Sequence, residues 1–70
     1  MSTKRERFKR LGEQRTNAVL QKLKILGNCA NRSAYEYTEE EINKIFSTIE
    51  KVVRETKAKF HFPARSQFKL

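Results

Sequence analysis

The apolar residues between Tyr37 and Phe60 recur with the period of an α-helix. They stand mostly three or four positions apart, with Thr56 in one otherwise apolar slot, and they are Ile42, Ile45, Phe46, Ile49, Val52, Val53 and Phe60. This spacing places them on one side of a helix and leaves the charged residues on the other side. The pattern therefore predicts an amphipathic helix over residues 38–60.

The beginning of this helix has a recognisable capping sequence. Thr38 is a good N-cap residue and Glu41 follows it three positions later, which is the spacing of a capping box. Tyr37 and Ile42 have the spacing of a hydrophobic staple across the same cap. The acidic side chains of residues 39–41 also lie at the positive end of the helix dipole. Together these signals predict that the helix starts at Thr38.

A second apolar stripe precedes this helix and predicts another helix over residues 4–26. Its members are Phe8, Leu11, Val19, Leu23 and Leu26. Thr3 and Glu6 have the spacing of a capping box at its start, and Gly27 is expected to end it in the left-handed conformation.

Two residues interrupt this first stripe. Gly12 is either a weak point of the helix, costing about 1 kcal/mol, or a place where another helix approaches closely. The first interpretation is favoured. Arg15 either extends its aliphatic stem over the apolar surface with its charge in water, or pairs with an acid on a partner.

The two helices predict an all-α protein with one domain. Both are about 22 residues long and one polar connection, residues 28–37, joins them, which favours an antiparallel two-helix hairpin over residues 1–60. Residues 61–70 are expected to form a short, flexible, basic and aromatic tail. Leu20 and Ile25 widen the apolar surface beyond what one facing helix covers, so we expect a homodimer that forms a four-helix bundle.

The net charge of +8 is distributed unevenly along the chain. Residues 1–27 contain eight basic and two acidic side chains, whereas residues 38–60 contain five of each. This asymmetry favours a polyanionic partner for the first helix and a structural role for the second. The predicted nucleic-acid-binding residues are Arg5, Arg7, Lys9, Arg10, Lys24, Arg65 and Lys69.

The partner of these cations is left open by the sequence. The leading interpretation is a small accessory protein that binds DNA or RNA through phosphates, with little base specificity. The alternative is a protein-interaction module or inhibitor whose basic face docks on an acidic or nucleic-acid-binding surface of another protein.

Residue types that carry catalysis or bind cofactors are scarce. The chain has one cysteine, one histidine and two glycines, and lacks a phosphate-binding glycine loop. His61 stands between two phenylalanines, and Cys29 has no second thiol or histidine near it in the sequence. We therefore expect no enzyme activity, no cofactor and no metal. The absence of a long apolar run or a signal peptide, together with the lone cysteine, predicts a cytoplasmic protein without a membrane span.

The segment from Leu26 to Glu41 matches the pattern L-G-N-x-x-N-R-S-x-Y-x-Y-T-x-E-E. It resembles a pattern in short uncharacterised basic helical proteins of bacterial plasmids, conjugative elements and phages. The resemblance implies a bacterial, cytoplasmic, accessory role and carries over no functional residue. It also raises the possibility of a contact surface in the loop, at Asn31, Arg32 and Tyr35, although a structural role for the tyrosine ring is favoured.

Overall fold

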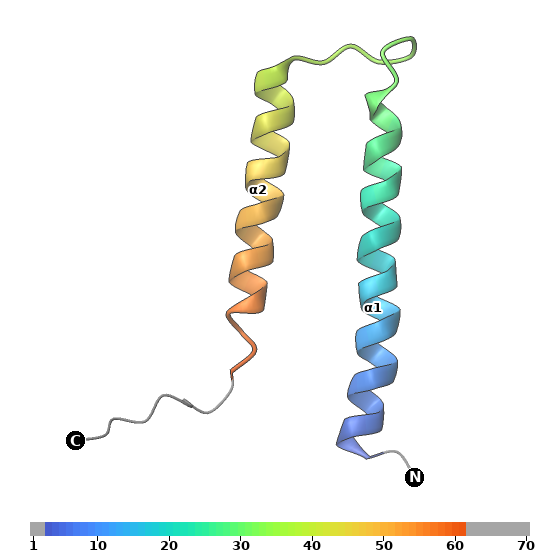
Figure 1. Cartoon of the computed structure of the whole chain (residues 1–70), viewed down its shortest axis with the longest axis vertical. Coiled ribbons are helices and arrows are strands. Elements are labelled where there is room, and N and C mark those ends of the chain that lie inside the picture. Colours follow the sequence, from blue (N-terminus) through green and yellow to red (C-terminus); the bar gives the residue numbers. More distant parts are fainter. Residues whose placement is uncertain (1–2, 62–70) are drawn as a thin grey trace, which may run out of the picture. The chain divides into compact units, whose positions relative to one another are not determined.

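The computed structural model describes residues 3–61, which form two α-helices and a connecting loop (Figure 1). Helix α1 spans Lys4–Gly27, the short 3-10 helix η1 spans Asn28–Ala30, and α2 spans Glu39–Lys57. The chain divides into two units between Glu36 and Tyr37, and each unit contains one of the two α-helices. The predicted all-α class is confirmed for the described residues, which contain no strand. The tail predicted for residues 61–70 lies outside them, apart from His61.

Helix α1 begins where its cap predicts. Thr3 has extended backbone angles, φ −79° and ψ 167°, and its side chain accepts a hydrogen bond from the backbone N–H of Glu6. That bond joins Glu6 N to Thr3 Oγ1 at 3.0 Å. It satisfies one of the four N–H groups that every helix start leaves without an intrahelical acceptor.

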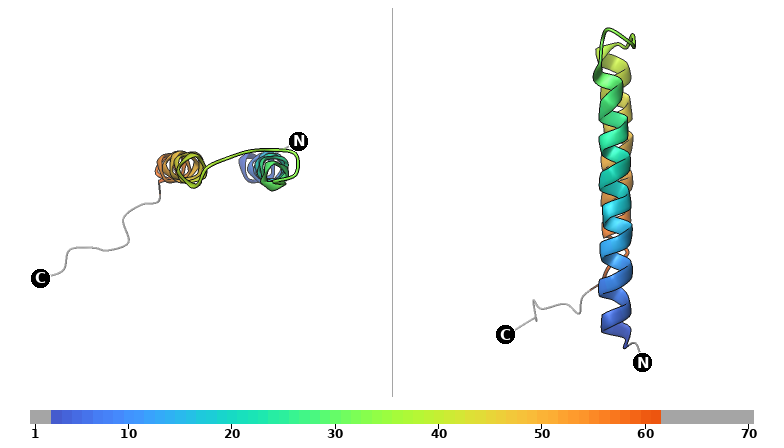
Figure 2. Two further views of the ribbon diagram at one scale, coloured as in Figure 1. Left: turned by 90° about the horizontal axis from the view of Figure 1, so that it is seen from above. Right: turned by 90° about the vertical axis from the view of Figure 1, so that its right-hand side faces the viewer.

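Helix α1 is one unbroken ribbon (Figure 2), and because it spans Lys4–Gly27 it continues past Gly12. The ring of Phe8, one turn earlier, lies over this glycine: a Cβ added at Gly12 would be 3.7 Å from Phe8 Cζ. This is an ordinary van der Waals separation, so a methyl group fits between the backbone and the ring. Within this helix, Gly12 is a position of weak helix propensity that costs about 1 kcal/mol relative to alanine.

The end of α1 differs from the prediction. Gly27 is still right-handed, with φ −61° and ψ −24°, and none of the described glycines has a positive φ. The α-helix therefore includes Gly27, and the chain tightens into η1 before it becomes extended at Asn31, with φ −68° and ψ 104°. A left-handed glycine is unnecessary here because the 3-10 helix η1 ends the α-helix and leads the backbone into the loop.

Asn31 closes the turn that follows η1. Its side-chain Oδ1 accepts a hydrogen bond of 3.0 Å from the backbone N–H of Ser33. Its carbonyl oxygen accepts bonds from the N–H groups of Ala34 and Tyr35, at 3.1 and 3.0 Å. This is the local side-chain to backbone bonding that favours asparagine in turns.

The predicted capping box at the start of α2 is confirmed. Thr38 Oγ1 accepts a hydrogen bond of 3.1 Å from the backbone N–H of Glu41. In return, the Glu41 carboxylate accepts a bond of 2.8 Å from the backbone N–H of Thr38. Thr38 itself is extended, with φ −106° and ψ 159°, so the helix proper begins at Glu39. Two backbone donors are thus satisfied reciprocally.

Helix α2 ends at Lys57, three residues before the predicted end. Ala58 N–H still bonds to the carbonyl of Arg54, four residues back. The next two donors bond only three residues back, from Lys59 to Thr56 and from Phe60 to Lys57, each at 3.1 Å. The backbone therefore tightens into turns at its C-terminal end, which is a common way to use the last carbonyls of a helix.

Replacing Thr38 with alanine is expected to destabilise α2 by about 0.5–2 kcal/mol, because the hydroxyl oxygen that accepts the bond from the backbone N–H of Glu41 is lost. The bond from the backbone N–H of residue 38 to the Glu41 carboxylate does not need the threonine side chain. Thr48→Ala is the matched control. Thr48 lies in the middle of the same helix, where its hydroxyl donates to the carbonyl of Lys44 at 2.8 Å, and alanine there is neutral or slightly favourable. Thermal unfolding followed by circular dichroism compares the two variants, and equal stabilities would contradict the role of the cap.

None of the described residues is buried. The apolar face of α2, defined here as Ile42, Ile45, Phe46, Ile49, Val52, Val53 and Thr56, includes Phe46 at 42% exposure and Val53 at 57%. On α1, Phe8 is 54% exposed and Val19 57%. Each unit contains a single long helix, and a helix cannot bury its own stripe, so both stripes need a second surface to form a core.

Candidate nucleic-acid interface

The densest group of cations lies in the first two turns of α1. Five of the seven residues from Lys4 to Arg10 are basic and one is acidic. At 1.5 Å per residue they occupy about 9 Å of the helix axis. All are exposed, so their charged groups are available to a ligand. We call this group, Lys4, Arg5, Arg7, Lys9 and Arg10, the basic collar.

The basic collar surrounds the helix instead of lying on one face. Successive residues of an α-helix are about 100° apart, which puts Arg5 and Lys9 on one flank of the apolar stripe. The same geometry puts Arg7 and Arg10 on the other flank and on the side opposite the stripe. Of the predicted residues, four are therefore brought close along the axis but point in different directions.

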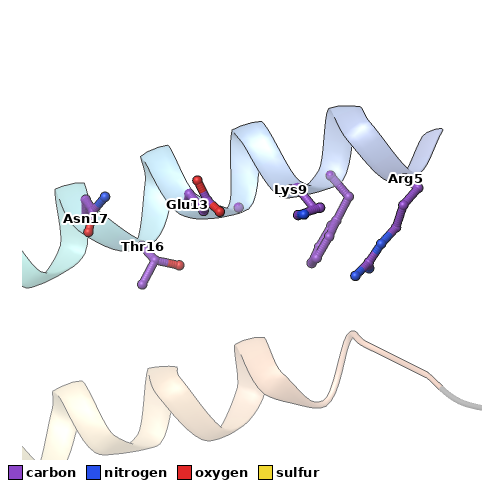
Figure 3. A pocket seen from close by; sticks show the side chains of 7 residues that line it. Arg5, Lys9, Glu13, Thr16 and Asn17 are labelled. Carbon is purple, nitrogen blue, oxygen red and sulfur yellow. The ribbon is translucent and has the colours of Figure 1, made fainter. Parts of the chain in front are cut away.

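A groove follows the flank that carries Arg5 and Lys9 (Figure 3). It is lined only by residues of α1, which are Arg5, Phe8, Lys9, Gly12, Glu13, Thr16 and Asn17. Its N-terminal part combines two cations with an exposed aromatic ring. Further along, Glu13 adds a carboxylate and Thr16 and Asn17 add polar groups. An anion is therefore favoured at the N-terminal end of the groove and disfavoured beside Glu13.

The remaining predicted cations do not join the basic collar. Lys24 is exposed and lies in the last turn of α1, 14 residues after Arg10 and so about 21 Å farther along the helix. At that position it faces the negative end of the helix dipole, where a lysine stabilises the helix. Arg65 and Lys69 lie outside the described residues.

The three loop residues are exposed, but two of them already have interactions within the structure. Asn31 uses its side-chain oxygen to close the turn, which is a structural role. Arg32 has an interaction partner. Tyr35 is 53% exposed, so its ring is accessible.

Lys4 belongs to the basic collar but was not among the predicted binding residues. As the first residue of α1 it opposes the helix dipole, which is an unfavourable position for a lysine within a helix. The run K-R-E-R-F-K-R in the sequence is the signal that identifies it.

A metal site and a membrane span are two further features that residues 3–61 lack. Across residues 3–61, no group of three or more His, Cys, Asp or Glu side chains is placed to hold a metal ion. Neither of the described α-helices is long and apolar enough to cross a membrane. No protein-family model, curated protein or solved structure matches the chain.

Proposed function

We propose that this protein is a small, non-enzymatic nucleic-acid-binding accessory protein, and that the basic collar of α1 holds backbone phosphates. The observation that carries the proposal is the concentration of five exposed cations in seven residues of one helix. The rest of α1 adds three cations and one acid over 17 residues, and α2 has four cations against five acids. The positive charge is thus concentrated where a polyanion is expected to bind.

The arrangement of the basic collar suits phosphates better than base edges. Phosphate binding needs mobile cations on a rigid support, and α1 is a continuous helix of 24 residues. Cations on both flanks of a helix can reach phosphates on both walls of a major groove, which is about 12 Å wide. Within residues 3–61, no cluster of Asn, Gln and Arg is set for bidentate contacts to bases, so we expect slight sequence preference.

The proposed active form is a dimer of hairpins. In it, α1 and α2 pack antiparallel within each chain, and two chains form a four-helix bundle that covers the exposed apolar stripes. The resemblance of the loop to short proteins of bacterial plasmids, conjugative elements and phages supports a cytoplasmic accessory role.

A second candidate is a protein-interaction module or inhibitor that docks the same cations on an acidic protein surface. Tyr35 favours it, because this tyrosine is 53% exposed in the loop and tyrosine is enriched at protein interfaces.

Titration of a labelled duplex, a single strand and an RNA hairpin at several salt concentrations tests the proposal. We expect binding at low salt whose logarithmic salt slope is about −0.9 per phosphate contact on duplex DNA and about −0.7 on a single strand. Sequence changes in the labelled duplex are expected to alter the affinity little. Absence of binding to all three ligands at low salt would reject nucleic-acid binding and leave the protein-interaction module as the better proposal.

A further inference from the structure

The apolar face of α2 is continuous along the whole helix. Five residues form the centre of this face and alternate spacings of three and four positions: Ile42, Ile45, Ile49, Val52 and Thr56. This is the heptad spacing of helices that pair along a seam. Phe46 and Val53 widen the face on one side. Both are substantially exposed, at 42% and 57%, so the face is available to a partner.

Helix α1 is a poor cover for this face by itself. Lys4, Arg15 and Lys22 project from the same side of α1 as its apolar residues, by the 3.6-residue period of the helix. A charged group pressed against isoleucine and phenylalanine loses hydration without gaining a partner. A second α2 has no charge within its apolar face and matches the first in length, so it is the better-suited surface.

The charges of α2 favour one direction of pairing. Three glutamates, Glu39, Glu40 and Glu41, occupy its first turn, and Arg54 and Lys57 its last. Parallel pairing would place the glutamates of two copies side by side, where like charges repel. Antiparallel pairing places the acidic start of each helix beside the basic end of the other. It also aligns the two helix dipoles in opposite directions, so that the positive end of each lies beside the negative end of the other.

We propose that two copies of this protein associate through their α2 apolar faces in an antiparallel arrangement centred on Ile49. The helical period then determines the contacts. Ile49 meets Ile49 of the second copy, Ile45 lies opposite its Val52, and Phe46 lies opposite its Val53. On the same side as Phe46, Glu39 lies opposite Lys57 of the second copy. The inference specifies the dimer contained in the proposed function, and it holds whether or not α1 binds nucleic acid.

Disulfide cross-linking of the full chain tests this register. Ile45→Cys and Val52→Cys are made separately, each combined with Cys29→Ser, and the two proteins are mixed in a glutathione redox buffer. We expect the mixture to form a heterodimer in which a disulfide joins one copy of each variant, with about twice the 8.3 kDa chain mass. Each variant alone is expected to stay largely uncross-linked. Intact mass spectrometry distinguishes the mixed dimer from the two symmetric ones.

A matched pair on the opposite side of α2 provides the control. Ser47→Cys and Lys51→Cys, mixed in the same way, are expected to give only the background of random oxidation. Efficient cross-linking of Ile45→Cys with itself would show parallel pairing, and cross-linking at the control level would show that the face does not meet a second copy. Either result overturns the proposal.

Light scattering on the unmodified protein guards against a variant that fails to fold. A monomer mass at high protein concentration would overturn the proposal irrespective of the cysteine variants. The nucleic-acid titration is a separate measurement, so loss of the dimer and loss of binding are distinguishable.

Discussion

Replacing Ile49 with alanine is expected to lower the free energy of unfolding by about 2–5 kcal/mol, the usual range for removing a large side chain from a core. Ile49 lies at the middle of the apolar face of α2, and it is one of the less exposed residues of that helix. In the proposed dimer it meets itself across the symmetry axis, so one substitution removes two side chains from the same place. A domain of 70 residues has little stability to spare.

The measurement is denaturant unfolding followed by circular dichroism at several protein concentrations. We expect the midpoint of the wild type to rise with concentration, because dissociation accompanies unfolding. The Ile49→Ala variant should unfold at lower denaturant and have a lower dimer population. Phe46→Ala is expected to act in the same direction, since Phe46 is 42% exposed in the single chain and has an aromatic ring to cover.

Ser47→Ala is the matched control for these variants. Ser47 lies on the side of α2 opposite the apolar face and is exposed, and alanine is the better helix former. We expect a stability equal to the wild type or slightly higher. A change of only a few tenths of a kcal/mol for Ile49→Ala would mean that nothing covers the apolar face, which would contradict the proposed core.

Replacing Arg7, Lys9 and Arg10 with glutamine in one triple variant is expected to weaken nucleic-acid binding strongly while the helices stay folded. These side chains are exposed and lie off the centre of the apolar stripe, so little packing is lost. If each holds one phosphate, the logarithmic salt slope on duplex DNA should become shallower by up to about 3. The difference in affinity should be greatest at low salt, because the released counterions drive the binding.

Helix α2 offers a control that changes the net charge by the same amount. Lys44, Lys51 and Arg54 are three exposed cations on the polar side of α2, and their replacement by glutamine also removes three positive charges. We expect this control to alter the salt slope much less, since α2 has no surplus of cations. Equal losses for the two triple variants would show that binding follows the net charge of +8 and has no localised site on α1.

The helix starts were predicted from the sequence with the best accuracy. Thr38 and Glu41 form the expected reciprocal bonds, and Thr3 accepts the expected bond from Glu6. A cap connects residues three positions apart, so the sequence contains both of its members. The amphipathic period is local in the same sense, and it identified α1 and α2 as helices.

The helix ends were predicted less well. The apolar stripe of the second helix includes Phe60, yet the α-helix stops at Lys57. Gly27 was expected to be left-handed and is right-handed. In both places the chain shifts to hydrogen bonds of 3-10 type. The two bonding patterns use the same residues and differ little in free energy, so the side-chain pattern does not decide between them.

The candidate site was predicted as a set of charges but not as an arrangement. Lysines and arginines near the N-terminus were identified from their number, whereas their distribution around α1 follows from the geometry of the helix. Lys24 was predicted to bind together with Arg7 and Arg10, although the helix separates Lys24 from Arg10 by about 21 Å. The position of the Phe8 ring over Gly12 could also not be predicted, because it depends on the side-chain rotamer of Phe8, which the sequence pattern does not specify.

The sequence by itself determined that this protein is helical, where its helices start, and that positive charge concentrates on the first of them. These properties depend on hydrogen bonds, periodicity and charge within a few residues of one another. Only the three-dimensional structure decided where each helix ends, which side chains line the groove on α1, and that Asn31 closes a turn. Those outcomes depend on the path of the backbone and on side-chain rotamers. At each of these places several local conformations have similar free energies, so the residue pattern alone does not select one.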